Sequence, residues 1–125
     1  MILLDTSVLV DALCGGRRSA PALRDAIEEG HRIRLPSLVL YEWLRGPRLD
    51  EELAAQEAVF PASEALPFGP TEAVRAAELY GHVARPRGRE IDLALGAMAL
   101  VHDASIWTLN ERDFSDLPDI ELYRA

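Results

Sequence analysis

The chain has 125 residues and a formal net charge of −8, from 21 acidic and 13 basic residues. Its length predicts one folded domain over residues 1–125 with an ordinary hydrophobic core. The acidic balance argues against a protein that binds nucleic acid by a broad basic face, but it does not exclude one that holds metal ions in an acidic pocket. All 13 basic residues are arginine, which excludes mechanisms that need a lysine, including those of P-loop and receiver domains.

Several features bear on cellular location. No segment reaches ~18 consecutive apolar residues, the length that a membrane-spanning helix needs. The first residues, MILLD, have the pattern of a strand and not the charged start of a signal peptide. The single cysteine, Cys14, cannot form an internal disulfide. We therefore expect a cytoplasmic protein without a membrane partner.

The first half of the chain alternates short apolar runs with helical patterns. Strands are expected at residues 1–4 and 33–35, each a short apolar run. Three helices are expected: from Thr6 to the break at Gly15–Gly16, from Ser19 to Glu29, and from Ser37 to the stop at Gly46–Pro47.

The second half continues this alternation. Helices are expected at residues 49–60, from 70 to about 83, and at 91–101, the last apolar nearly all round. Strands are expected at residues 65–68, 105–109 and 120–123. Alternating strands and helices predict an α/β fold with a parallel sheet covered by helices on both faces. The expected architecture is therefore a three-layer α/β/α domain with about five parallel strands.

Acidic residues recur where these elements meet. Asp5 follows the first strand, where it either caps the next helix or serves a polar site. Glu42 interrupts an apolar helix, and a solvent-facing position would explain it when taken alone. Asp92 lies in the first turn of the apolar helix, where the helix dipole suffices to stabilise it only if that turn is exposed. Asn110 and Asp113 follow a late strand, as turn or cap residues also do.

These positions have a common geometric consequence. The carboxyl ends of parallel strands meet at one edge of the sheet, where ligands usually bind. We expect the acidic side chains to converge there. Oxygen ligands without a histidine or cysteine cluster favour Mg²⁺ or Mn²⁺ over zinc.

The segments ILLDTSVLVDAL, LPSLVLYEWLRG and IDLALGAMALVHDASIWTLNERDF resemble those of the PIN-domain family. The similarity is greatest to its VapC-type branch, the ribonuclease toxins of type II toxin–antitoxin pairs. It covers nearly the whole chain. It implies a PIN-like fold and a metal-dependent endoribonuclease that hydrolyses RNA phosphodiester bonds with Mg²⁺ or Mn²⁺. The alternative is a catalytically weak or inactive PIN-like domain that acts as a protein-binding module.

The resemblance also implies a site. Asp5, Glu42 and Asp92 match the three main acidic positions, and Asp113 is the nearest carboxylate for the fourth. Asn110 also lies where the fourth acid could fall and would be a weaker ligand. Two questions stay open: whether Asn110 or Asp113 fills the fourth position, and whether the site binds one or two metal ions. Small hydroxyl residues that line such pockets are matched by Thr6 and Thr108.

The resemblance further implies an RNA substrate, a cognate antitoxin and a homodimer. The candidates for positioning the RNA backbone are Arg17, Arg18, Arg45, Arg48, Arg85, Arg87 and Arg89. Solvated surface charge is the favoured explanation of any one of them taken singly. Exposed apolar residues on the segments 43–44 and 49–53 are a candidate surface for the antitoxin, although core packing explains these residues equally well. Two substitutions, Asp5→Asn and Asp92→Asn, are expected to abolish cleavage and to keep the fold. They are expected even to raise the stability, because like charges in an empty pocket repel each other.

Overall fold

The computed structural model describes residues 1–125. Its centre is a sheet of four parallel strands with the order β2-β1-β3-β4. Leu3 of β1 pairs with Arg34 of β2 on one side and with Ile106 of β3 on the other. The strands are β1 (Ile2–Leu4), β2 (Ile33–Arg34), β3 (Ser105–Trp107) and β4 (Glu121–Leu122).

The predicted α/β class and parallel sheet are confirmed, but the strand expected at residues 65–68 is wrong. That segment forms only an isolated parallel bridge between Pro36 and Leu66. Leu66 N donates to Leu35 O at 2.9 Å, and Ser37 N donates to Leu66 O at 2.8 Å. Pairing extends no further because α3 begins directly after Pro36, and because Pro67 has no N–H to donate.

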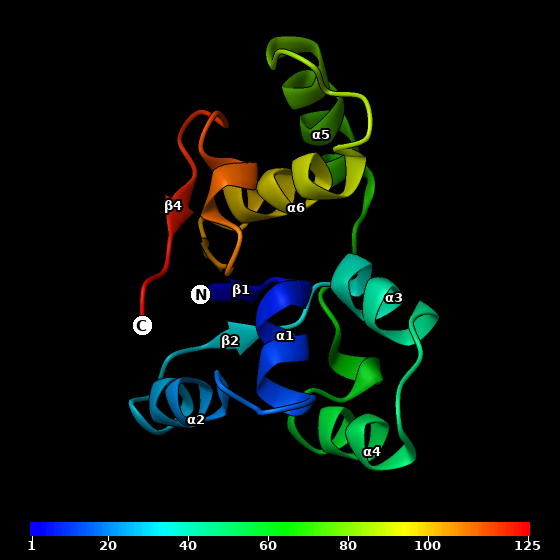
Figure 1. Cartoon of the computed structure of the whole chain (residues 1–125). Helices are drawn as coiled ribbons and strands as arrows, with labels where there is room; N and C mark the ends of the chain where they lie inside the picture. Colours follow the sequence, from blue (N-terminus) through cyan, green and yellow to red (C-terminus); the bar gives the residue numbers. More distant parts are fainter.

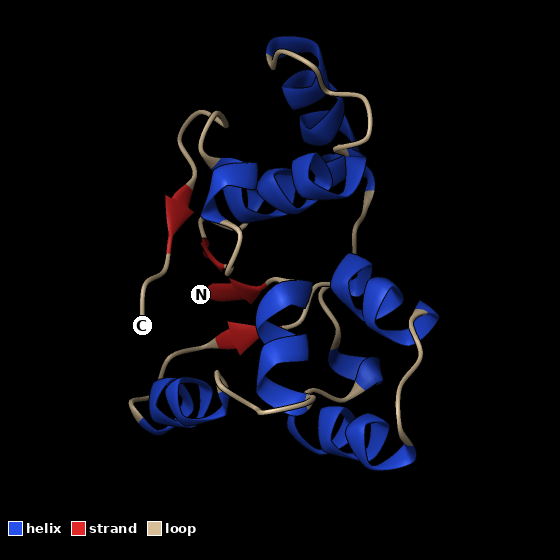
Figure 2. Cartoon of the chain, viewed as in Figure 1, coloured by secondary structure: helices blue, strands red, loops and turns tan.

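Six helices cover the two faces of the sheet (Figures 1 and 2). Helices α5 and α6 lie on one side and α1 to α4 on the other (Figure 1). Their bounds are α1 (Thr6–Leu13), α2 (Ala20–Glu28), α3 (Ser37–Arg45), α4 (Asp50–Val59), α5 (Pro70–His82) and α6 (Glu90–Val101). Two short 3₁₀ helices are η1 (Ala62–Glu64) and η2 (Glu111–Phe114). The longest of these helices has 13 residues, and none combines the length and apolar character needed to cross a bilayer.

The hydrophobic core lies between the sheet and the helices beside it. Leu3, Leu4 and Ile106 of the two central strands are fully buried. Seven consecutive residues of α6, from Leu93 to Ala99, are buried as well, which explains why this helix is apolar all round. Gly96 permits close packing here, because a Cβ at this position would lie 2.8 Å from Leu117 Cδ1.

The sheet places the ends of β1 and β3 side by side. Asp5 N, just past β1, donates to Trp107 O at 2.9 Å. Asp5 is also the N-cap of α1, and its Oδ1 accepts from Thr6 N at 2.9 Å. The residues that follow the two strands, Asp5 and Thr108, therefore meet at one edge of the sheet, as the parallel topology predicts.

Candidate active site

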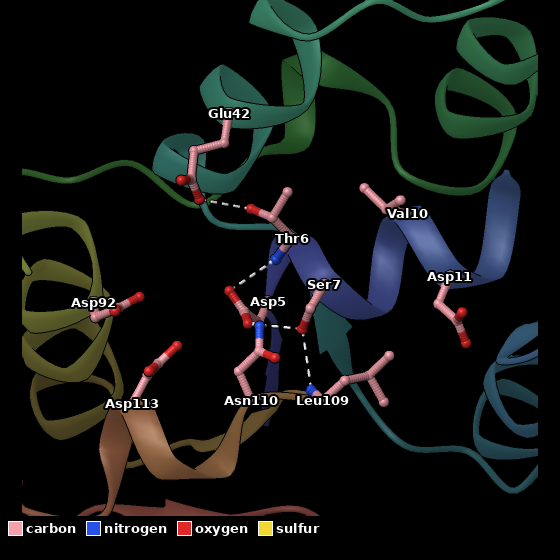
Figure 3. Close-up of a pocket in the computed structure, with 10 residues that line it drawn as sticks. All are labelled: Asp5, Thr6, Ser7, Val10, Asp11, Glu42, Asp92, Leu109, Asn110 and Asp113. Carbon is pink, nitrogen blue, oxygen red and sulfur yellow. Dashed lines mark hydrogen bonds between the residues drawn. The ribbon is translucent and has the colours of Figure 1, made fainter.

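A pocket of about 360 Å³ opens at this edge of the sheet. Its wall combines the start of α1, one residue of α3, the first turn of α6 and the segment after β3 (Figure 3). The pocket is lined by Asp5, Thr6, Ser7, Val10, Asp11, Glu42, Asp92, Leu109, Asn110 and Asp113. Five of these ten residues are acidic and none is basic.

Asp5 is the most firmly held of these acids. Only 8% of the residue is exposed. Its Oδ2 accepts from Ser7 Oγ at 2.8 Å and from Thr108 Oγ1 at 2.7 Å. Together with the bond from Thr6 N, these donors satisfy the carboxylate and fix its orientation. The capping role and the role in a polar site, weighed as alternatives, thus belong to the same side chain.

Glu42 reaches the pocket from α3. Its Oε1 accepts a 2.7 Å hydrogen bond from Thr6 Oγ1, and Arg45 Nη2 lies 3.6 Å from its Oε2. The side chain is 22% exposed. The solvent-facing explanation of Glu42 is therefore wrong, because helix α3 turns this carboxylate toward α1 (Figure 3).

Asp92 is the electrostatically strained member of the group. Burial raises the pKa of its carboxyl to about 6, and the charges of Asp113, Asp5 and Glu42 add to the effect. The guanidinium of Arg89 opposes this shift in pKa. The sequence left open whether the dipole of α6 suffices to stabilise the Asp92 carboxylate. Because burial raises the pKa of this group, the dipole alone does not offset the cost of burying it.

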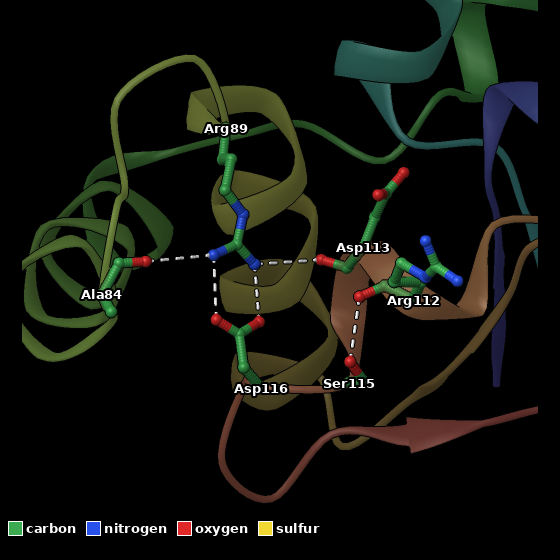
Figure 4. A network of polar contacts seen from close by, with 6 residues as sticks. All are labelled: Ala84, Arg89, Arg112, Asp113, Ser115 and Asp116. Atoms are coloured by element: carbon green, nitrogen blue, oxygen red, sulfur yellow. Dashed lines mark hydrogen bonds and ion pairs between the residues drawn. The ribbon is translucent and has the colours of Figure 1, made fainter.

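Asp113 lies on η2 and faces the same pocket as Asp92, and both carboxylates point into it (Figure 3). The side chain of Arg89 anchors the segment that carries Asp113 (Figure 4). The guanidinium donates to both carboxylate oxygens of Asp116, at 2.8 and 2.6 Å, and to the backbone oxygen of Asp113 at 3.2 Å. A further bond reaches Ala84 O at 3.4 Å. This pairing with Asp116 raises the pKa of Arg89 and lowers that of Asp116.

The structure brings most of the predicted site residues together. Asp5, Glu42, Asp92, Asp113, Asn110 and Thr6 all line the pocket. Thr108 does not line it; the residue is buried and acts through its hydrogen bonds to Asp5 and to Asn110 N. Asn110 and Asp113 both reach the pocket, so the geometry does not force a choice between them.

The acids share a pocket, but they are not gathered around a point. No group of three histidine, cysteine, aspartate or glutamate side chains is close enough to hold one ion. The expected convergence is thus looser than the sequence suggested. Mg²⁺ nevertheless suits the donors, because it keeps several waters and commonly binds through one or two carboxylates together with a substrate phosphate. Asp92 and Asp113, whose carboxylates both point into the pocket (Figure 3), supply such a pair.

Sequence reasoning missed three contributors. Ser7 bridges Asp5 and Leu109 N, at 2.8 and 3.0 Å, although its place two residues after Asp5 was a signal. Asp11 lies four residues beyond Ser7 and so on the same face of α1. Arg89, a candidate for positioning RNA, instead holds Asp116 and the backbone of Asp113, and this role had no local signal because Asp116 is 27 positions away.

The candidate apolar surface is only partly exposed. Trp43 is fully buried, with the Arg48 guanidinium 4.3 Å from the centre of its ring. Of the two explanations for Trp43, a receiving surface or core packing, the structure therefore confirms core packing. Leu44 and Leu49 are exposed, at 52% and 59%.

Comparison with known proteins identifies the family. The PIN domain model matches residues 2–120, so the chain belongs to the PIN domain family. A relative from Mycobacterium tuberculosis, Ribonuclease VapC19, is 37% identical over 127 residues, which cover 97% of this chain and 98% of the relative. The resemblance noted from the sequence is thereby confirmed.

Solved structures share the fold. VapBC from Salmonella typhimurium, crystallised with DNA, matches with a TM-score of 0.78 and 20% identity, over 98% of this chain and 96% of that chain. VapBC2 from Rickettsia felis, bound to a promoter DNA fragment, matches with a TM-score of 0.73 and 18% identity, over 98% of each chain. At these identities the similarity establishes the three-layer architecture.

Proposed function

We propose that this protein is a metal-dependent endoribonuclease that acts as the toxin of a toxin–antitoxin pair. The observation that carries the proposal is the pocket itself. Side chains from four separate segments meet there, and burial together with its acidic neighbours holds the pKa of Asp92 at about 6. Such a pocket is disfavoured without a cation, and perturbed carboxyls in a cleft are typical of functional sites. The homology to a curated ribonuclease adds the substrate class.

The proposed catalytic residues are Asp5, Glu42, Asp92 and Asp113, with Asn110 as a further ligand. When bound, Mg²⁺ or Mn²⁺ would neutralise the carboxylates, polarise a phosphoryl oxygen and lower the pKa of the attacking water. Thr6 holds the Glu42 carboxylate by its 2.7 Å bond. Ser7 and Thr108 hold Asp5 in the same way. These hydroxyls keep the acids oriented before substrate arrives, which limits reorganisation during the reaction.

The proposed partners follow from the family. Solved relatives are toxin–antitoxin complexes, including one from Klebsiella pneumoniae. We propose that a cognate antitoxin binds this chain and that the protein forms a homodimer. The exposed Leu44 and Leu49 are candidate contact residues for such partners.

A cleavage assay with purified protein tests the proposal. End-labelled single-stranded RNA is incubated with Mg²⁺, with Mn²⁺ or with EDTA, and the product ends are mapped. We expect cleavage only with a divalent cation and 5′-phosphate ends on the downstream product. Asp92→Asn should abolish cleavage, whereas Asp25→Asn on the exposed part of α2 should leave it unchanged.

Two results would contradict the proposal. Equal cleavage by wild type, Asp5→Asn and Asp92→Asn would identify a contaminating nuclease. No cleavage by wild type, together with tight binding of the product of a neighbouring reading frame, would instead support an inactive PIN domain that serves as a binding module.

A further inference from the structure

A second pocket adjoins the acidic one. It measures about 290 Å³ and lies between the start of α2, the end of β3 and the segment after β4. Leu109 lines both pockets and is 52% exposed. Its backbone N–H is anchored to Ser7 Oγ at 3.0 Å, so Leu109 forms a fixed ridge between the two depressions.

A polar contact on the other wall also joins the two pockets. Ser19, which lines the second pocket, donates to Asp11 Oδ2 at 2.6 Å. Asp11 lines the acidic pocket. The start of α2 is therefore fixed relative to α1. An RNA strand that left the acidic pocket over Leu109 would enter a second pocket with defined walls.

The second pocket differs in charge. Its charged side chains are Arg18, Arg124 and one acid, Glu111, whereas the acidic pocket has no basic residue. Arg124 is paired with Glu111 through two hydrogen bonds, at 3.1 and 3.0 Å. Arg18 is exposed and forms no ion pair within 4.0 Å. Its positive charge is therefore free to contact an anion, and the guanidinium fork fits a phosphate well.

An aromatic side chain stands in the same pocket. Tyr123 is partly exposed and packs against buried Trp107, with ring centroids 5.0 Å apart. This contact holds the Tyr123 ring in place. Single-stranded RNA is commonly recognised by stacking of an unpaired base on an aromatic side chain, with arginine on the backbone.

We propose that the second pocket binds the nucleotide next to the scissile bond, with Arg18 on its phosphate and Tyr123 against its base. This inference rests on the proposed ribonuclease function and adds to it a path for the RNA strand. The strand would cross the ridge at Leu109, so that the cleaved phosphate lies among the acids while its neighbour meets Arg18. The pairing of a basic subsite with an acidic reaction site also explains how a protein of net charge −8 retains a polyanion.

Kinetics of Arg18→Gln on a single-stranded RNA oligonucleotide test the proposal. We expect KM to rise about threefold to tenfold with little change in kcat, because the contact lies beside the reacting phosphate. The slope of log KM against log salt should become shallower by about 0.7, the value for one contact to a single strand. Arg18→Lys should restore part of the affinity. Arg24→Gln, an equal loss of charge on the exposed side of α2, is the matched control and should leave KM unchanged.

A methylphosphonate scan locates the contact. RNAs with one neutral phosphate at successive positions are compared with wild type and with Arg18→Gln. We expect one position adjacent to the cleavage site to weaken wild type but to have no further effect on Arg18→Gln, because the two changes remove the same interaction. Additive losses at every position would overturn the proposal.

Binding of the same RNA with Ca²⁺ in place of Mg²⁺, followed by fluorescence anisotropy, separates this inference from the proposed function. Cleavage with identical KM values for Arg18→Gln and Arg24→Gln overturns only the second pocket. Arg18-dependent binding without any cleavage supports the pocket and overturns the ribonuclease. Absence of both cleavage and binding overturns both proposals.

Discussion

Asp92→Asn should stabilise the cation-free protein at neutral pH. Burial and the neighbouring acids raise the pKa of this carboxyl from 3.8 to about 6. Each pKa unit corresponds to ~1.36 kcal/mol, which would give about 3 kcal/mol for the whole shift. Because the residue is only partly buried, solvent screening reduces this figure, and we expect about 1 kcal/mol. For a chain of this size, that gain corresponds to a rise of about 3–5 °C in Tm.

The sign of the pH dependence follows from proton linkage. Between pH 3.8 and about 6 the Asp92 carboxyl is protonated in a larger fraction of folded than of unfolded molecules. The free energy of unfolding of wild type therefore falls as pH rises through this window. Asparagine does not titrate, so the advantage of Asp92→Asn should be small near pH 4 and complete above about pH 7.

Urea unfolding followed by tryptophan fluorescence measures this difference, since Trp43 and Trp107 are both buried. Adding Mg²⁺ should reverse the order, because a cation at roughly ten times its Kd stabilises wild type by about 1.4 kcal/mol and the variant less. Asp25→Asn serves as the control for loss of an exposed charge. A variant less stable than wild type at pH 7.5, or a difference that is constant from pH 4 to 7.5, would refute the electrostatic account of the pocket.

Substitutions at four other positions probe separate parts of the structure. Asp5→Asn should lower the free energy of unfolding by about 1–3 kcal/mol, because one amide oxygen replaces a carboxylate that accepts three hydrogen bonds; unchanged urea midpoints would contradict this. Arg89→Gln should slow cleavage more than Arg89→Lys, since it releases the backbone of Asp113, and equal rates would exclude a positioning role. Gly81→Ala should add about 0.5 kcal/mol in thermal unfolding because space around it is open, whereas Gly96→Ala should gain nothing against Leu117; equal shifts would show that α6 has room to spare.

The overall architecture could be predicted because its signals are local and redundant. The apolar run before Asp5 and the apolar helix around Asp92 both require burial, and alternation of elements then specifies a parallel sheet. The prediction of a strand at residues 65–68 was wrong for a local reason. Its partner segment carries Pro36 at the start of α3, so a hydrophobic run that resembled a strand had only one bridge available.

That the candidate site residues share one pocket could be predicted from the sequence, but the interactions that hold each of them could not. Sequence reasoning assigned the same stability gain to Asp5→Asn and Asp92→Asn, because it counted only the repulsion between carboxylates. The structure separates them through donors contributed by other segments. Thr108, 103 positions away from Asp5, supplies one of its hydrogen bonds, and no local pattern predicts such a partner.

The distribution of donors has a consequence for where a cation would matter most. Asp5 and Glu42 are held by hydroxyls of the chain, so their orientation does not depend on an ion. No hydrogen bond reaches the carboxylate of Asp92 or that of Asp113, although both point into the pocket (Figure 3) and the charge of Asp113 raises the pKa of Asp92. Removing their mutual repulsion therefore requires a proton or a metal ion. The two halves of the pocket should accordingly respond differently to Mg²⁺: ordering and stabilisation should appear first on η2 and the start of α6, while the start of α1 should stay as it is.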